Sequence, residues 1–289
     1  MTSTVEPPQS NRWFAVPRPI QYLFNHFPLH VYGPEDLPVR SPASVRQRPA
    51  LYVFVAEEDA VLGRPSYNPS CLKWQTVLKI AGVEFDIVPS NNHASPSGAL
   101  PFLLPSSSQT PKPLAGQKIH KYALEHAARE LPKISSPRLE AYQALLTQNI
   151  RPAWLYALYL LPANAPLLKS LYLPSSILLR KPLHQTLHAA ATTEILKTTR
   201  RATISPSQIF DDARTALGAL SALLGDDKWF FGAEGPGLFD ADIFAYTYLM
   251  DGDTLAWADS SLNECLEGLE NLRKHRQRLY KHCWGVDKS

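Results

Sequence analysis

The sequence predicts an α/β domain followed by an all-helical domain, and two observations lead to this fold class. Two apolar segments of strand length, Leu51–Val55 and Glu84–Pro89, flank a segment of helical spacing that starts after Asn68-Pro69 and ends at Gly82. A strand, a helix and a second strand joined in this way form a βαβ unit with a parallel strand pair. From Ser136 onward the strand patterns stop, and apolar residues recur at the spacing of helices.

Asparagine and proline mark further elements of the first domain. Asn68 is a suitable N-cap, and the proline after it fits the first helical position. Gly98–Leu104 is predicted to be a third strand, and Pro101, which opens it, can follow a cis peptide bond. Ser106–Pro113 is predicted to be a hairpin loop, and His120–Arg129 a helix.

The all-helical domain is organised around one buried helix in the stretch Trp229–Met250. After a turn rich in glycine and proline, this helix is apolar on almost every side, which is typical of a helix in the centre of a domain. Asp240 stands three residues after Gly237, where its carboxylate can accept backbone N–H bonds at the start of the helix. The other helices are therefore expected to pack around this one.

Prolines divide the rest of the all-helical domain. Pro152 is expected to kink or break the first helix, and residues 162–206 are expected to be short apolar pieces cut by prolines. Ser205 and Gln208 fit a capping box, and a last helix is predicted over Ser260–Trp284. The core face of the helix after the capping box is predicted to be Ile209, Ala213, Leu217, Leu220 and Leu224.

Composition excludes several classes of protein. The formal net charge of +3 is too small to indicate a nucleic-acid partner. Cys71, Cys265 and Cys283 have neither the spacing of a disulfide framework nor that of a metal knuckle, which fits a reducing compartment. No apolar run has the length of a membrane span, and the N-terminus lacks the apolar region of a signal peptide.

The residues before the first strand are predicted to be an arm and a linker rich in proline and arginine. The predicted boundaries are 1–49 for this extension, 50–130 for the α/β domain and 131–289 for the all-helical domain. Aromatic residues of the arm include Trp13, Phe14, Tyr22 and Phe24. Two interpretations stay open, a strap packed on the main body or an arm that docks on a partner or a membrane surface.

Positive charge gathers in one part of the all-helical domain. Between Tyr142 and Phe210 the only acidic residue is Glu194. The basic residues there include Arg180, Lys181, Arg200 and Arg201. A solvated face explains most charge runs, but apolar pieces beside one-sided positive charge also suit a surface held near anionic lipid or an acidic partner. Together with the four aromatic residues of the arm, these four basic residues are the predicted partner-binding residues.

The order of elements resembles the glutathione-transferase-like plan, with a thioredoxin-like N-terminal domain and a C-terminal helical domain. Within that plan the sequence resembles the metaxin family. The matching segments are Leu51–Val55, Asn68–Gly82, Gly98–Leu104, Trp229–Gly232 and Pro236–Phe244. Gly237 departs from the family, which usually carries a Ser or Thr cap there, although glycine is an acceptable cap.

The resemblance also implies a function. The proline- and arginine-rich arm, the length and the lack of a C-terminal membrane anchor most resemble the fungal receptor subunit of the mitochondrial sorting and assembly machinery, which is similar to the second metaxin. The implied protein has no enzymatic activity and lies on the cytosolic face of the outer membrane. Its implied partners are the β-barrel insertase of that membrane, a second metaxin-like subunit, β-barrel precursor proteins and the membrane surface.

The main alternative is a glutathione-dependent thiol transferase with Cys71 as nucleophile. A transferase needs a hydroxyl or thiol near the N-terminus of its first helix, where amide groups and the helix dipole stabilise a thiolate. Cys71 stands in that neighbourhood, as do Ser66, Tyr67 and Ser70. Cys71 also starts the apolar stripe of the helix, so a buried core cysteine is expected.

The positions that would hold the charges of glutathione favour a binding protein over an enzyme. By resemblance, the acid–serine pair of transferases would fall on Ala115-Gly116, before the helix near Ile119. Neither residue has a side chain that binds an ammonium or a carboxylate. Leu100-Pro101 would still offer backbone hydrogen bonds to a peptide. A scaffold that keeps the fold without these charged contacts fits a binding protein.

No catalytic, cofactor-binding or metal-binding residue is assigned from the sequence. His184 and His188 are four residues apart, a spacing that could bind zinc, but without a third ligand nearby they are expected to be a surface pair. A third possible function is a soluble scaffold of the translation-factor type.

Overall fold

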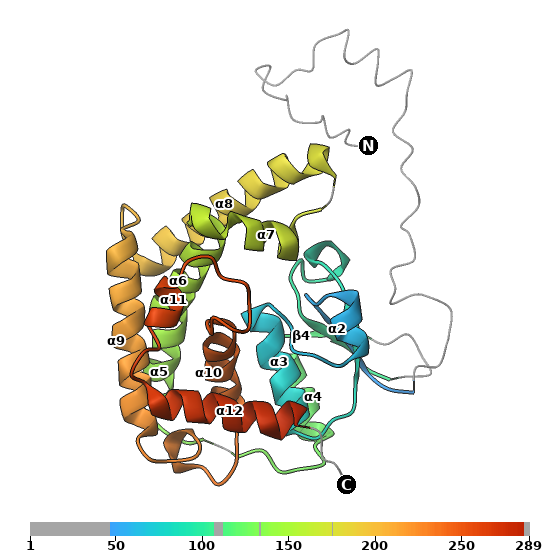
Figure 1. Ribbon diagram of the computed structural model, residues 1–289. Helices are drawn as coiled ribbons and strands as arrows, with labels where there is room; N and C mark the ends of the chain where they lie inside the picture. The colour runs from blue at the N-terminus through green and yellow to red at the C-terminus, as the bar shows by residue number, and fades with distance from the viewer. Residues whose placement is uncertain (1–46, 107–111, 133, 175, 286–289) are drawn as a thin grey trace, which may run out of the picture. The chain divides into compact units, whose positions relative to one another are not determined.

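A mixed sheet of four strands forms the first part of the computed structural model, which describes residues 47–106, 112–132, 134–174 and 176–285 (Figure 1). The strands are β1 (Ala50–Val53), β2 (Asp86–Pro89), β3 (Phe102–Leu104) and β4 (Leu114–Ala115). β1 pairs in parallel with β2 and antiparallel with β3, and β3 pairs antiparallel with β4, so the order is β2-β1-β3-β4. The predicted parallel pair is confirmed.

Three helices accompany the sheet: α2 (Glu57–Val61), α3 (Pro69–Ile80) and α4 (Gln117–Glu125). The predicted N-cap is confirmed, because the Asn68 side chain accepts a hydrogen bond from the backbone N–H of Cys71 at 3.2 Å. The Leu100–Pro101 peptide bond is cis, as the sequence allowed. The predicted bounds of His120–Arg129 were wrong, because α4 starts directly after Gly116, where φ is +56°.

The remaining helices belong to the all-helical part (Figure 1). They are α5 (Leu139–Leu145), α6 (Arg151–Leu155), α7 (Ala165–Tyr172), α8 (Ile177–Thr199), α9 (Pro206–Leu224), α10 (Leu238–Leu249), α11 (Ser261–Glu264) and α12 (Glu270–Trp284). Within the ranges that the structure covers, no helix combines the length and the apolar character needed to cross a membrane.

Helix α10 is the central helix that its apolar pattern predicted. It packs against α3 and α12, and nine of its twelve residues are buried. The Asp240 carboxylate accepts hydrogen bonds from the backbone N–H of Gly237 at 2.9 Å and of Phe230 at 3.1 Å. It thus fixes both the start of α10 and the turn before it, as expected from its position.

The glycine at position 237 has a packing reason. A Cβ atom there would lie 3.2 Å from Cγ of Pro132 in the segment between α4 and α5. That distance is short for two carbon atoms, so a Ser or Thr cap would push this segment away from α10. The close approach gives a packing reason for glycine at this position.

The α-helix is interrupted just before Pro152, as expected, whereas the prediction for Pro182 overestimated how strongly proline interrupts a helix. Pro152 lies near the start of α6, directly after a π-helical turn over Leu146–Ile150. The extra residue of such a turn can accommodate a residue without an N–H. Pro182 lies inside α8, a helix of 23 residues in a region predicted to consist of short pieces. It is the sixth residue of that helix, where the carbonyl that it leaves unpaired lies near an exposed end.

Two predicted boundaries also differ from the structure. Ser205 makes no side-chain capping bond to α9, so the predicted capping box is wrong. The predicted last helix is two helices, α11 and α12, because the chain turns at Gly268 with φ of +75°. The five predicted core residues of α9 are all buried. Residues Pro42–Ser289 group as one compact unit, and the domain boundary at 130/131 stays a prediction.

Candidate functional site

The N-terminus of α3 is the place where a transferase would hold its reactive group, and here it carries a buried thiol. Cys71 has no exposed surface. Burial raises the pKa of its thiol to about 12, although hydrogen bonds with Phe54 and Ser66 act in the other direction. At neutral pH the group is therefore a protonated thiol, which is a poor nucleophile. The expected core cysteine is confirmed.

Aromatic side chains close over this end of α3. We call the group Phe54, Tyr67, Tyr159 and Tyr172 the aromatic plug. Tyr172, from the last turn of α7, contacts Phe54 with a centroid distance of 5.1 Å and Tyr67 with one of 5.3 Å. Its hydroxyl accepts a hydrogen bond from the side-chain amide of Asn68 at 3.0 Å. A helix of the all-helical part therefore covers the cap of α3.

The hydroxyl groups near the thiol already have partners. The Tyr67 hydroxyl donates to the carbonyl of Leu171 at 2.9 Å, and burial raises its pKa to about 12. Ser66 has no exposed surface, and its hydroxyl donates to the carbonyl of Phe54. Its backbone N–H donates to the side chain of Gln75 at 2.9 Å. Each of these hydroxyls thus holds neighbouring segments together, whereas Ser70 is exposed.

The loop with the cis proline offers less to a bound peptide than its sequence suggested. The backbone N–H of Leu100 donates to the side chain of Asn92 at 2.9 Å. Leu100 itself is only 6% exposed. The expectation that Leu100-Pro101 would present free backbone bonds is therefore wrong for this N–H, because a side chain of the chain itself occupies it.

The junction between β4 and α4 lies where the resemblance placed the charged contacts of a transferase. β4 ends at Ala115, and Gly116 precedes the first residue of α4. A Cβ atom on Gly116 would meet no other atom within 4 Å. The junction therefore presents an alanine methyl group and bare backbone, without an acid or a hydroxyl to bind the γ-glutamyl group.

Partly buried contacts join α3 and the loop before it to the all-helical part. Lys73 Nζ lies 2.7 Å from Asp242 Oδ2 of α10, and the two side chains are 20% and 16% exposed. Burial raises the pKa of the Asp242 carboxyl, and the ammonium of Lys73 opposes that shift. In the loop between α2 and α3, the carbonyl of Gly63 accepts a hydrogen bond from the indole N–H of Trp284 at 2.9 Å. These contacts suit a rigid platform better than a cleft that opens for a substrate.

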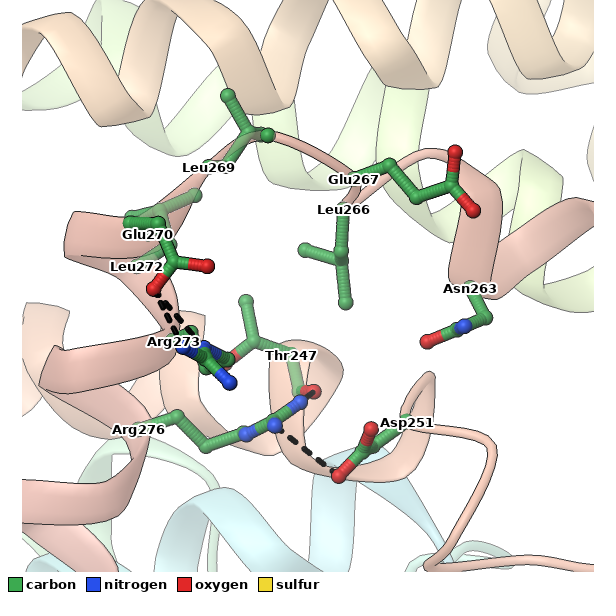
Figure 2. Close-up of a pocket in the computed structure, with 11 residues that line it drawn as sticks. Thr247, Asp251, Asn263, Leu266, Glu267, Leu269, Glu270, Leu272, Arg273 and Arg276 are labelled. Atoms are coloured by element: carbon green, nitrogen blue, oxygen red, sulfur yellow. Dashed lines mark hydrogen bonds and ion pairs between the residues drawn. The ribbon is translucent and has the colours of Figure 1, made fainter.

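A hollow of about 260 Å³ lies between the end of α10, α11 and the start of α12. Figure 2 shows the ion pairs that line it. Arg276 is paired with Asp251 at 3.0 Å and Arg273 with Glu270 at 2.6 Å. Arg276 also donates to the carbonyl of Thr247 at 3.2 Å. The ion pair between Arg276 and Asp251 connects α12 to the loop after α10. Because carboxylates neutralise both arginines, the hollow is a weak site for an anion.

The predicted partner-binding residues of the all-helical part do not form one patch. Arg180 and Lys181 lie at the start of α8, whereas Arg200 ends it in the left-handed conformation. At 1.5 Å rise per residue, the two groups are about 28 Å apart along the helix. Arg201 is paired with Asp212 at 2.6 Å. The four arm residues Trp13, Phe14, Tyr22 and Phe24 lie outside the described residues.

Sequence reasoning missed the residues that close the site. Tyr172 belongs to the proline-cut region 162–206 and Tyr159 precedes it, and their aromatic character was the available signal. His184 and His188 have a ring-centroid distance of 6.5 Å on α8. Across the described ranges, no three His, Cys, Asp or Glu side chains are placed to hold a metal ion.

Comparisons of the sequence with known proteins give two family matches and one relative. The family model described as Glutathione S-transferase N-terminal domain matches residues 69–164, and the one described as Glutathione S-transferase, C-terminal domain matches residues 213–279. Metaxin-3 of Xenopus laevis is 26% identical over 197 residues, which is 64% of this chain and 62% of the relative. The chain thus spans less than two thirds of the length of that curated relative.

Solved structures give the same architecture. A glutathione transferase from Phanerochaete chrysosporium has a TM-score of 0.53 at 14% identity, over 82% of this chain and 97% of that chain. A second, from Ceriporiopsis subvermispora and in complex with glutathione, has a TM-score of 0.54 at 14% identity, over 84% of this chain and 100% of that chain. These similarities concern the fold alone, and the predicted fold class is confirmed.

Proposed function

Because the chain is a metaxin-like protein built on the glutathione-transferase-like architecture, we propose that it is a non-enzymatic subunit of the machinery that sorts and assembles β-barrel proteins in the mitochondrial outer membrane. In this proposal it is a peripheral protein on the cytosolic face. It binds the barrel insertase, a second metaxin-like subunit and β-barrel precursors. It takes no cofactor and no nucleic acid.

The closed end of α3 is the observation that carries the proposal. A transferase must admit glutathione to this end, place a thiolate or hydroxyl beside it and bind its charged groups. Here Tyr172 covers the helix cap, the pKa of the Cys71 thiol is raised to about 12, and the junction at Gly116 has no side chain to contribute. These features support a fold that has been kept for its outer surface rather than for catalysis.

Strand β2 lies at an edge of the described sheet, but it is poorly suited to bind a precursor as an added strand. Asp86 donates its backbone N–H to Pro49 and Ser90 donates to Val53, so alternate residues face β1. Ile87 and Pro89 then face outward, and proline has no N–H to donate. A groove of about 650 Å³ beside this edge, lined in part by Val61, Phe85 and Ile87, is the better candidate for an extended client segment.

The experiment is an affinity capture from detergent-solubilised mitochondria with the full chain as bait. Recovery of a β-barrel insertase, identified by mass spectrometry, is the expected result. A bait with Trp13→Ser and Phe14→Ser tests the predicted arm, and Leu124→Ser, a change at an apolar residue that is 43% exposed, is the control. If the unmodified bait recovers no insertase under conditions that keep the complex intact, the proposed function is wrong.

The alternative, a glutathione-dependent transferase that uses Cys71, makes a different prediction. It requires conjugation of glutathione to an electrophile, with turnover that disappears in Cys71→Ala. A third candidate, a soluble scaffold of the translation-factor type, predicts that the chain stays in the soluble fraction when outer membranes are sedimented. Sedimentation separates this candidate from a peripheral membrane protein, which pellets with the outer membranes and is then released from them by carbonate.

A further inference from the structure

Two adjacent leucines stand out at the start of α8. Leu178 is 86% exposed and Leu179 is 62% exposed. They lie in the first turn of α8, and in Figure 1 this end of the helix extends away from the helices that surround α10. Single exposed apolar residues are common, but a pair of leucines at a projecting helix end is unusual on a soluble surface.

The first half of α8 has little cover from the rest of the described fold. From Leu178 to Ala190 no side chain is buried, whereas Ala191 is 5% and Ile195 is 1% exposed. Helix α8 packs on the turn Leu146–Ile150, on α6 and on the turn Tyr156–Leu160. The leucine pair therefore projects from the fold on a helix whose other half is packed against it. A planar surface could contact the pair without a change in the fold.

The charge around the leucines identifies the kind of surface. Lys181, two residues after Leu179, is exposed, and Lys169 is exposed on the preceding helix α7. The first turn of α8 contains no acidic residue. Exposed leucines combined with lysines are the pattern of segments that insert apolar side chains among anionic lipid head groups.

A second exposed apolar pair on the same chain provides the contrast. Val61 is 87% exposed and Leu62 is 63% exposed at the end of α2. The first turn of that helix carries Glu57, Glu58 and Asp59. Its apolar exposure matches that of the pair on α8, but its charge has the opposite sign. An anionic bilayer would therefore attract α8 and repel α2.

We propose that the start of α8 is a membrane foot, in which Leu178 and Leu179 insert into the head-group region of an anionic bilayer while Lys181 and Lys169 contact lipid phosphates. This contact rests on the proposed function and deepens it, because it names the residues that would meet the membrane surface. It would set which side of the platform faces the lipid.

Flotation of the full chain with vesicles tests the foot. The vesicles are phosphatidylcholine alone, or phosphatidylcholine mixed with phosphatidylserine. We expect binding to the mixed vesicles that weakens in high salt, and little binding to phosphatidylcholine alone. Leu178→Ser with Leu179→Ser should weaken binding by tenfold or more, since one buried leucine is worth about tenfold in partition. Val61→Ser with Leu62→Ser is the matched control and should bind as the wild type does.

A positive signal comes from a fluorescent reporter. The wild type carries six tryptophans, so the emission of the added indole is taken as the difference from the wild-type spectrum. In Leu178→Trp this emission should shift to the blue when mixed vesicles are added, because the indole leaves water, whereas in Val61→Trp it should not. Both positions are more than four-fifths exposed, so neither change should alter the folded circular dichroism spectrum. A lack of blue shift at position 178, or equal loss of binding in the two serine pairs, overturns the proposal.

A second copy of this chain could also bind the leucine pair, and the molecular mass measured by light scattering tests this alternative. If the wild type is a dimer and the leucine variant is a monomer, the pair is an interface between copies and the membrane foot is wrong. The vesicles contain no protein, so failure of the foot leaves capture of the insertase intact. In the same way, failure of the capture leaves vesicle binding intact.

Discussion

Replacement of Asp240 by alanine is expected to destabilise the fold more than any change on its surface. The carboxylate has no exposed surface. It accepts backbone N–H bonds from Gly237 and Phe230, and its Oδ1 atom lies 2.9 Å from Nε2 of His275 on α12. Asp240 therefore joins the start of α10, the turn before it and α12 at one buried point.

The magnitude follows from what the substitution leaves behind. Asp240→Ala leaves two buried backbone N–H groups and a buried imidazole without their partner. Each such group costs about 1–3 kcal/mol, so for the three groups together we expect a loss of about 4 kcal/mol. The imidazole of His275 would then have no hydrogen bond on either nitrogen, because its Nδ1 atom is already buried without a hydrogen-bond partner among the described residues.

Urea unfolding followed by tryptophan fluorescence measures this loss. Glu234→Ala changes an exposed acid in the same turn and should shift the free energy of unfolding by less than about 0.5 kcal/mol. Combining Asp240→Ala with His275→Ala should cost less than the sum of the two single changes, because the pair is shared. A loss below about 1 kcal/mol for Asp240→Ala would refute the assignment of Asp240 as the junction of the helical part.

Three further predictions concern the α3 helix. Lys73→Ala should lower the free energy of unfolding in urea by about 3 kcal/mol, because it leaves the largely buried Asp242 carboxylate unpaired. Lys73→Met combined with Asp242→Leu should recover most of this loss. Equal stability of Lys73→Ala and the wild type would contradict this prediction. In the wild type, Cys71 should resist alkylation by iodoacetamide at neutral pH. Tyr172→Ala, which opens the aromatic plug, should increase the labelling of Cys71, as measured by peptide mass spectrometry. Equal labelling in the wild type and the variant would show that Tyr172 does not cover the thiol. Burial raises the pKa of the Cys71 thiol from 9.0 to about 12, so between these pH values the folded chain keeps a proton that the unfolded chain releases. The free energy of unfolding should therefore fall as the pH rises between these values, by up to about 1.4 kcal/mol per pH unit for this group. Urea titrations at several pH values should show a shallower fall for Cys71→Ala, and identical slopes would contradict the shift.

Local patterns were sufficient for the elements that depend on neighbouring residues. The cap at Asn68, the cis bond before Pro101 and the N3 position of Asp240 each follow from side chains within a few residues, and the structure has all three. The same is true of the buried thiol, because the apolar stripe that contains Cys71 is visible in the sequence. Such features need no knowledge of which helices pack together.

Contacts between distant segments could not be predicted in this way. Tyr67 and Leu171 are 104 residues apart, and Lys73 and Asp242 are 169 residues apart. Periodicity indicates which face of a helix is buried, but not which partner covers it. The aromatic plug and the ion pair between α3 and α10 therefore appear only in the folded chain. Pro182 shows a different limit, because a proline near an exposed helix end costs less than one in a buried interior.

Titration of glutathione into the full chain by isothermal calorimetry tests the closed site most directly. With the cap covered by Tyr172 and no charged side chain at Ala115 or Gly116, we predict no saturable heat, and the same flat titration for Cys71→Ala. Saturable binding at one glutathione per chain would contradict the account, because it would mean that the end of α3 still admits the peptide.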